Sequence, residues 1–300
     1  MISGIDPTTD RFLFDLERIR SRGERAARQI TSGYRVSRPS DDPSAVPEII
    51  NTQSRLDHLE QLTHNLGRIQ TETDGAEKGL QSAVKLLDQI SVWASQGATS
   101  TTTAGTRQML AGQVGATLDR LVAIANTDVG GRLVFAGDAD QVEPYGVDWT
   151  LADGVTSYAG TAATRDAEDF SGGRFRVART AEEIFQTSGD GNVFGAVAGL
   201  KTALAANDQA AIEAALSRLA ASRDHLNGQL AFYGGVQSRI QAELDAASAG
   251  RLDQQATLTR LRETDLTEAS LELVQSRTGL EAALAARSAR PRSTLFDYLG

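Results

Sequence analysis

The chain has 300 residues, of which 40% are apolar and only 5% aromatic, and its formal net charge is −9 at pH 7. This charge argues against nucleic acid as the main partner, and the lack of cysteine excludes disulfides, thiolate catalysis and thiolate metal sites. No run of about 18 apolar residues occurs, so no membrane span is expected, and residues 1–14 lack the apolar core of a secretory signal peptide.

The first predicted helix lies near the N-terminus, where apolar or small residues recur in steps of four and three. This spacing is typical of the a/d stripe of a coiled coil. A loop of turn-forming residues follows, and we expect Ser40, Asp41 or Asp42 to cap the next helix. The helix can instead begin at Pro47, which would lengthen the loop. The stripe comprises Ile5, Phe12, Leu16, Ile19, Gly23, Ala26, Ile30 and Gly33, and the loop comprises Pro39, Ser40, Asp41, Asp42 and Pro43.

Four more helices are predicted from the same three-and-four spacing. They cover residues 59–94, 110–125, 212–244 and 266–283. The stretch 212–244 alone would be about 50 Å long at ~1.5 Å per residue, which is too long for a compact globule. In the last helix Leu266, Leu273 and Leu280 repeat at seven-residue spacing, which predicts a second coiled-coil stripe.

The segment between the third and fourth helices differs in character. Its residues 133–135 and 175–177 suggest short strands, and glycine pairs mark turns. The expected fold is therefore mainly α: an elongated helical rod with N- and C-terminal coiled-coil arms and a small β-rich insertion domain. We expect a terminal coiled-coil assembly domain at 1–42 plus 262–300, a helical rod domain at 43–130 plus 192–261, and the insertion domain at 131–191.

The two ends of the chain carry opposite charge. Residues 11–38 hold eight arginines against three acidic residues, whereas residues 263–281 hold five acidic residues against Arg277. The two terminal helices can therefore attract each other, within one chain or between copies. The alternative, that both are merely solvated charged faces, is equally compatible with the charges.

No assembled catalytic, metal or cofactor site is evident. Asp41 and Asp42 are neighbours on a turn, which favours capping over a catalytic dyad, and His58 and His64 do not share a helix face. The pair Asp138 and Asp140 lacks the remaining ligands of a calcium loop. The sparse aromatic residues favour an insertion core over an outward surface for a sugar or a partner. They are Trp93, Phe135, Tyr145, Trp149 and Tyr158.

Several segments together resemble the bacterial flagellin family. They are residues 29–36, 39–43, Asn65, 131–137, 264–269 and 295–299. Each is weak alone, but their order and their placement at both termini make the set specific. The resemblance implies an inner coiled-coil domain, an outward insertion, and export of the unfolded chain through the flagellum's own type III channel. It also implies arms that become helical on assembly.

The resemblance favours a structural subunit at the junction between hook and filament, secreted to the extracellular flagellum, and not an enzyme. Expected partners are further copies of the chain in a ring or tube, a neighbouring hook-associated protein, flagellin and an export chaperone, with no nucleic acid and no membrane. The alternatives are the filament subunit itself and a free-standing coiled-coil interaction module. The expected assembly interface comprises Ile5, Phe12, Leu16, Ile19, Ile30, Leu266, Leu273, Leu280, Leu295, Phe296, Tyr298 and Leu299.

Overall fold

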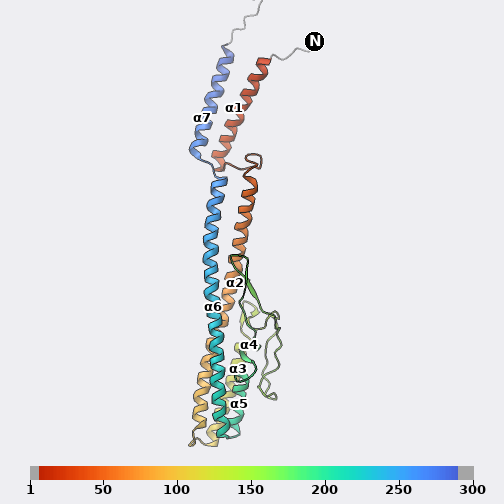
Figure 1. The fold of residues 1–300 in the computed structure, drawn as a ribbon, viewed down its shortest axis with the longest axis vertical. Helices are drawn as coiled ribbons and strands as arrows, with labels where there is room; N and C mark the ends of the chain where they lie inside the picture. Colours follow the sequence, from red (N-terminus) through yellow and green to blue (C-terminus); the bar gives the residue numbers. More distant parts are fainter. Residues whose placement is uncertain (1–6, 290–300) are drawn as a thin grey trace, which may run out of the picture. The chain divides into compact units, whose positions relative to one another are not determined.

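The computed structural model describes residues 7–289 and confirms a mainly helical fold with small β elements (Figure 1). Internal contacts divide the chain into two units, residues 1–58 with 250–300 and residues 59–249. The expected three-part division is finer and stays a prediction. The elements are α1 Pro7–Ser32, α2 Val46–Ala98, α3 Ala104–Ala125, β1 Asp128–Val129, β2 Arg132–Leu133, β3 Asp166–Glu168, β4 Arg174–Arg176, α4 Ala181–Phe185, α5 Val193–Ala205, α6 Gln209–Arg262 and α7 Leu266–Ser288.

The unit 59–249 is built around one large apolar core. Figure 1 shows α3 and α5 beside α2 and α6, and all four helices contribute buried side chains to this core. The three-and-four spacing explains which face of each helix is buried, because it repeats an apolar side chain on that side. Representative fully buried residues are Leu80, Leu87 and Ile90 of α2, Val114, Leu118 and Leu121 of α3, Leu200 of α5, and Leu219 and Leu226 of α6.

The segment between α3 and α5 joins that core through its aromatic residues. The rings of Phe135 and Phe185 meet edge to face with centroids 6.1 Å apart, and those of Phe185 and Phe194 stack at 5.5 Å. Tyr145 is fully buried as well, whereas 40% of Trp149 is exposed. Most of the expected aromatic cluster is therefore core, and Trp149 lies at its surface.

Two small antiparallel hairpins make up the β structure. The first joins β1 to β2 through Gly130 and Gly131, whose φ angles of 64° and 83° are those that a tight primed turn requires. The second pairs β3 with β4, placing Ala167 opposite Phe175. Both of these side chains are buried in a second core, with residues of α2 and α6. The expected strand at 133–135 is shorter than predicted, because Phe135 leaves the ladder to enter the core.

The unit formed by residues 1–58 and 250–300 contains α1, the start of α2, the end of α6 and α7. Its main packing contact lies between α1 and α7. Within the described residues 7–289, none of the helices has the length and hydropathy needed to cross a membrane.

Candidate assembly surface

The helices α1 and α7 pack through small side chains. Ala26, Ala269 and Ser276 are the buried residues of this pair, with exposed fractions of 1%, 3% and 9%. A Cβ atom on Gly23 would lie 3.1 Å from the Cβ atom of Ser276, and one on Gly279 would lie 3.8 Å from Ile19. Small residues at the crossing thus let the two helices approach closely, although each glycine weakens its helix by about 1 kcal/mol relative to alanine.

Gly23 and Ala26 of the predicted α1 stripe lie in this contact, whereas the larger apolar residues of the two stripes flank it. The side chains of Phe12, Leu16, Ile19 and Ile30 on α1 are half-buried, as are those of Leu273 and Leu280 on α7. Leu266 begins α7 with 54% of its surface exposed. A pair of helices cannot cover a whole apolar stripe, so part of it stays open to solvent. Ile5, Leu295, Phe296, Tyr298 and Leu299 lie outside the described residues.

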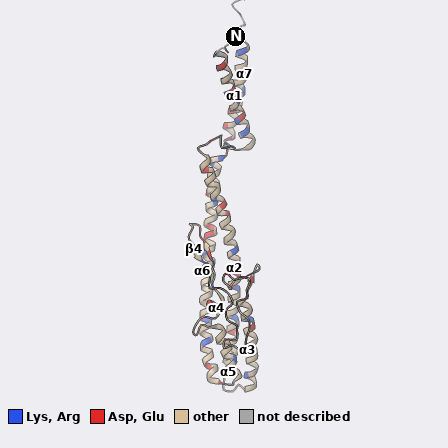
Figure 2. Cartoon of the chain, turned by 90° about the vertical axis from the view of Figure 1, so that its right-hand side faces the viewer, with Lys and Arg blue, Asp and Glu red and all other residues tan. Residues whose placement is uncertain are grey.

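Polar contacts between the two helices are sparse. A guanidinium nitrogen of Arg22 lies 3.8 Å from a carboxylate oxygen of Glu272, and both side chains are well exposed. The guanidinium of Arg287 lies 5.4 Å from the ring centre of Phe12 and donates to the hydroxyl of Thr9 at 3.0 Å. Exposed ion pairs of this kind contribute at most about 1 kcal/mol. Figure 2 shows acidic and basic residues along α1 and α7.

Residues 33–36 and 262–264 pair with each other between the helices, and we call this contact the clasp. The amide of Arg35 donates to the carbonyl of Arg262 at 2.7 Å, and the amide of Thr264 donates to the carbonyl of Gly33 at 3.0 Å. The guanidinium of Arg262 lies 4.3 Å from the centre of the Tyr34 ring. Gly33 has a φ of 74°, a left-handed conformation that ends α1 and turns the chain into the clasp.

Asp41 and Asp42 organise the loop that leads to α2. A carboxylate oxygen of Asp41 accepts from the amides of Ser37 and Arg38 at 3.0 and 2.8 Å, and these bonds lower its pKa. Asp42 accepts from the Ser44 hydroxyl at 2.6 Å and from Arg35 at 2.7 Å, which together lower its pKa to about 2.

These contacts show what the expected capping residues do. Asp42 also accepts from the amides of Ser44 and Ala45, just before α2 begins at Val46, so it stabilises the turn that starts this helix. Asp41 instead closes the preceding turn. Pro47 lies in the first turn of α2, where a missing N–H costs little. Ser40 and Pro43 are exposed.

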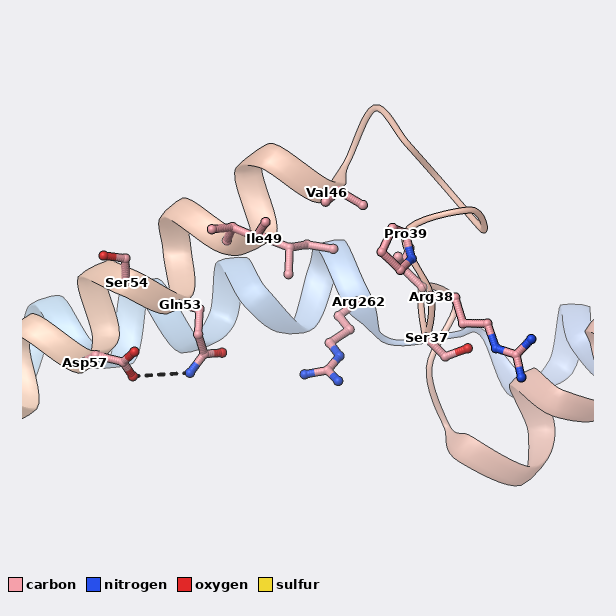
Figure 3. Close-up of a pocket in the computed structure, with 11 residues that line it drawn as sticks. Ser37, Arg38, Pro39, Val46, Ile49, Gln53, Ser54, Asp57 and Arg262 are labelled. Atoms are coloured by element: carbon pink, nitrogen blue, oxygen red, sulfur yellow. Dashed lines mark hydrogen bonds between the residues drawn. The ribbon is translucent and has the colours of Figure 1, made fainter.

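An open groove of about 450 Å³ lies beside this loop. Figure 3 shows its walls, which come from the loop, from the first turns of α2 and from Arg262 at the end of α6. The lining is mainly apolar, and 63% of Ile50 is exposed there. The apolar side chains in the lining are Val36, Pro39, Val46, Ile49 and Ile50.

Large apolar side chains also point away from the contact between α1 and α7. On α1, Phe14 is 71% exposed, and on α7 Leu271 and Val274 are 58% and 60% exposed. Leu271 and Val274 lie on the side of α7 opposite the buried Ala269 and Ser276. Together with the half-covered stripes, these residues give the helix pair an apolar surface that needs a partner.

The histidine and acidic side chains of the described residues do not gather into a metal site. No group of three or more histidine or acidic side chains there could hold a metal ion. His225 contacts the carbonyl oxygen of Glu183 at 3.0 Å, which is a structural role.

Sequence patterns missed the clasp and the groove. Tyr34 and Glu263 form an isolated antiparallel bridge although more than two hundred positions separate them, and neither lies in an apolar repeat. The one available signal was glycine at position 33 after a helical stripe, which marks a helix end but not its distant partner. Groove residues such as Ile49 and Ile50 lie in the first turns of α2, ahead of the apolar repeat that begins at residue 59, so no repeat marks them.

Comparison with known proteins gives one family match and a consistent fold. Residues 15–140 match the bacterial flagellin N-terminal helical region, so the resemblance seen in the sequence is confirmed there. Among curated protein sequences there is no match.

Three solved structures illustrate the shared fold. A chain from Vibrio parahaemolyticus, provisionally assigned as a flagellar hook-associated protein, is 20% identical, with a TM-score of 0.66 over 74% of this chain and 100% of that one. FlgL from Bacillus cereus is 18% identical, with a TM-score of 0.56 over 71% and 100%. Flagellar hook-associated protein 3 from Legionella pneumophila is 14% identical, with a TM-score of 0.63 over 71% and 98%.

Proposed function

We propose that this chain, which carries the N-terminal helical region of bacterial flagellins, is a structural subunit of the bacterial flagellum that forms the junction between hook and filament. The observation that carries the proposal is the apolar surface left open on α1 and α7, in a fold shared with FlgL and flagellar hook-associated proteins. A surface of this kind suits side-by-side assembly, and the chain acts as a building block rather than as an enzyme.

The interface between copies comprises the two helix stripes and the C-terminal tail. Assembly covers the half-buried side chains of Phe12, Leu16 and Leu273 and the exposed Leu266, and removing this area from water supplies the driving force. The remaining members are Ile5, Ile19, Ile30, Leu280, Leu295, Phe296, Tyr298 and Leu299. The loop with Ser40, Asp41, Asp42 and Pro43 connects this terminal domain to the rod.

The partners follow from the position in the flagellum. Further copies form a ring or tube, a neighbouring hook-associated protein lies on one side, and flagellin lies on the other. The chain works outside the cell, after export through the flagellar channel with the help of a chaperone that shields its apolar helices. The three solved structures, two of which are named as flagellar hook-associated proteins and one as FlgL, favour this role over that of the filament subunit.

Labelling of intact flagella tests the role. Antibody against the chain, carried on gold particles, should mark one short zone between hook and filament in electron micrographs of the source bacterium. Labelling along the whole filament would identify the chain as flagellin. Labelling confined to the cell interior would instead favour the free-standing coiled-coil module.

A further inference from the structure

The groove beside the clasp has a mainly apolar lining, and its charged residues are two arginines, Arg38 and Arg262, and one acidic residue, Asp57. Pro39 and Val46 line it from the loop and from α2, and Ile50 lies in it with 63% of its surface exposed. Arg38 lies at the rim, and within residues 7–289 its side chain forms no ion pair. An occupant that fits this groove should bring an apolar side chain flanked by negative charge.

Phe14 has these properties. Its exposed fraction of 71% is high for an aromatic residue on a helix, and no other described element covers it. Asp10 and Glu17 lie four residues before it and three after it, so their carboxylates share its face of α1. Neither carboxylate forms an ion pair with another described residue.

The same chain cannot supply this occupant. Phe14 lies eighteen residues before Ser32, where α1 ends next to the groove. At ~1.5 Å per residue, the helix holds Phe14 about 27 Å away from that end. The only Phe14 that can reach the groove belongs to another copy, displaced by about this length along α1.

We propose that Phe14 of one copy docks into the groove of a second copy, with Glu17 and Asp10 facing Arg38. Phe14 and the groove lie on different surfaces of the same chain, so the contact is head to tail and repeats from copy to copy. The inference rests on the proposed self-assembly. It adds the contact that sets how far one copy is displaced along its neighbour. An anchor side chain that fills a pocket and is shielded there from water is typical of an interface hot spot.

Photo-crosslinking tests the pairing without removing the aromatic ring. The full chain with Phe14→benzoylphenylalanine is expressed in the source bacterium in place of the natural chain, its flagella are isolated and irradiated, and the linked peptides are identified by mass spectrometry. We expect intermolecular links to residues 46–54. Phe170→benzoylphenylalanine is the matched control, because Phe170 is an exposed aromatic residue of the other unit, at 45%, and should give no link to those residues.

Charge reversal at Arg38 and Glu17 is the second test of the pairing. Arg38→Glu places like charges at the rim and should reduce incorporation into flagella about tenfold. Adding Glu17→Arg to that variant should restore most of the loss. Arg55→Glu, on an exposed part of α2 outside the groove, should incorporate normally.

The outcomes separate this pairing from the proposed function. Incorporation of the Phe14 variant without links to residues 46–54, or a double variant no better than Arg38→Glu alone, would contradict the pairing and leave the junction role intact. Absence of the natural chain from isolated flagella would contradict the junction role and the pairing together.

Discussion

Asp42 holds the loop before α2 through a hydroxyl and a guanidinium. Because its pKa in the folded chain, about 2, lies below the ordinary 3.8, its contacts stabilise the loop fully above about pH 4 and are lost as the pH falls toward 2. We predict a carboxyl-carbon NMR titration of Asp42 with a midpoint near 2. Ser44→Ala should raise that midpoint because it removes the largest cause of the shift, and Ser40→Ala should not. An equal midpoint in all three chains would contradict this assignment.

Arg107 is a buried cation that ties together the ends of three helices. Its guanidinium donates to the carbonyls of Gly97 and Thr99 at 2.8 and 3.3 Å and to the Asn207 side chain at 2.6 Å. We predict that Arg107→Ala lowers the free energy of unfolding of the unit 59–249 by about 3 kcal/mol, since the buried carbonyl of Gly97 and two partly exposed acceptors lose a charged donor. Urea denaturation followed by circular dichroism measures this. Arg120→Ala, exposed on the same helix, should cost less than about 0.5 kcal/mol.

A substitution at Phe12 tests the contact between α1 and α7. Phe12→Asp places a carboxylate in a half-buried apolar position and removes the ring beside Arg287, which should weaken the helix pair by about 2 kcal/mol. The unit 59–249 should keep its thermal transition, whereas joining of the chain to hook ends should fail. Normal incorporation of the variant, measured by immunoblot of isolated flagella, would show that this stripe is not needed for assembly.

The α1–α7 pair depends on the absence of a side chain at Gly23. A Cβ atom there would already press on Ser276 at 3.1 Å, so Gly23→Leu should force the helices apart and expose them to protease. Gly67→Leu is the matched control, because nothing lies within 4 Å of a Cβ atom at that position on α2. Limited proteolysis should cut α1 and α7 of the first variant several times faster than those of the control. Equal rates would mean that close approach at Gly23 does not hold the pair together.

The helices and their contacts show which features of the structure the sequence could predict. Repeats such as Leu80 and Leu87 identified the helices and their buried faces, because one helix face must meet the core. Leu266 satisfied the same seven-residue repeat and is nevertheless 54% exposed, since periodicity tells which face a residue lies on but not whether a partner covers it. The clasp joins distant positions through backbone amides and carbonyls, which carry no sequence signal, and no repeat pairs Arg107 with the side chain of Asn207, 100 positions away.

At the scale of the whole molecule, the two units differ in how much apolar core they have. The unit 59–249 has a large aromatic and aliphatic core, whereas α1 and α7 of the other unit bury only small residues between them. A domain with so little core gains much of its stability from neighbours. This asymmetry fits the proposed function, in which the terminal helices complete their packing between copies.

Seeded assembly tests the central claim, that the chain joins a flagellum as a junction subunit. Purified full-length chain is added at rising concentration to fragments of the source bacterium's hooks and filaments, and the products are viewed by electron microscopy. The account predicts a short layer of fixed length on hook ends, which stops growing as the concentration rises. Continuous elongation would identify a filament subunit instead, and a failure to add to either kind of fragment would contradict the flagellar role.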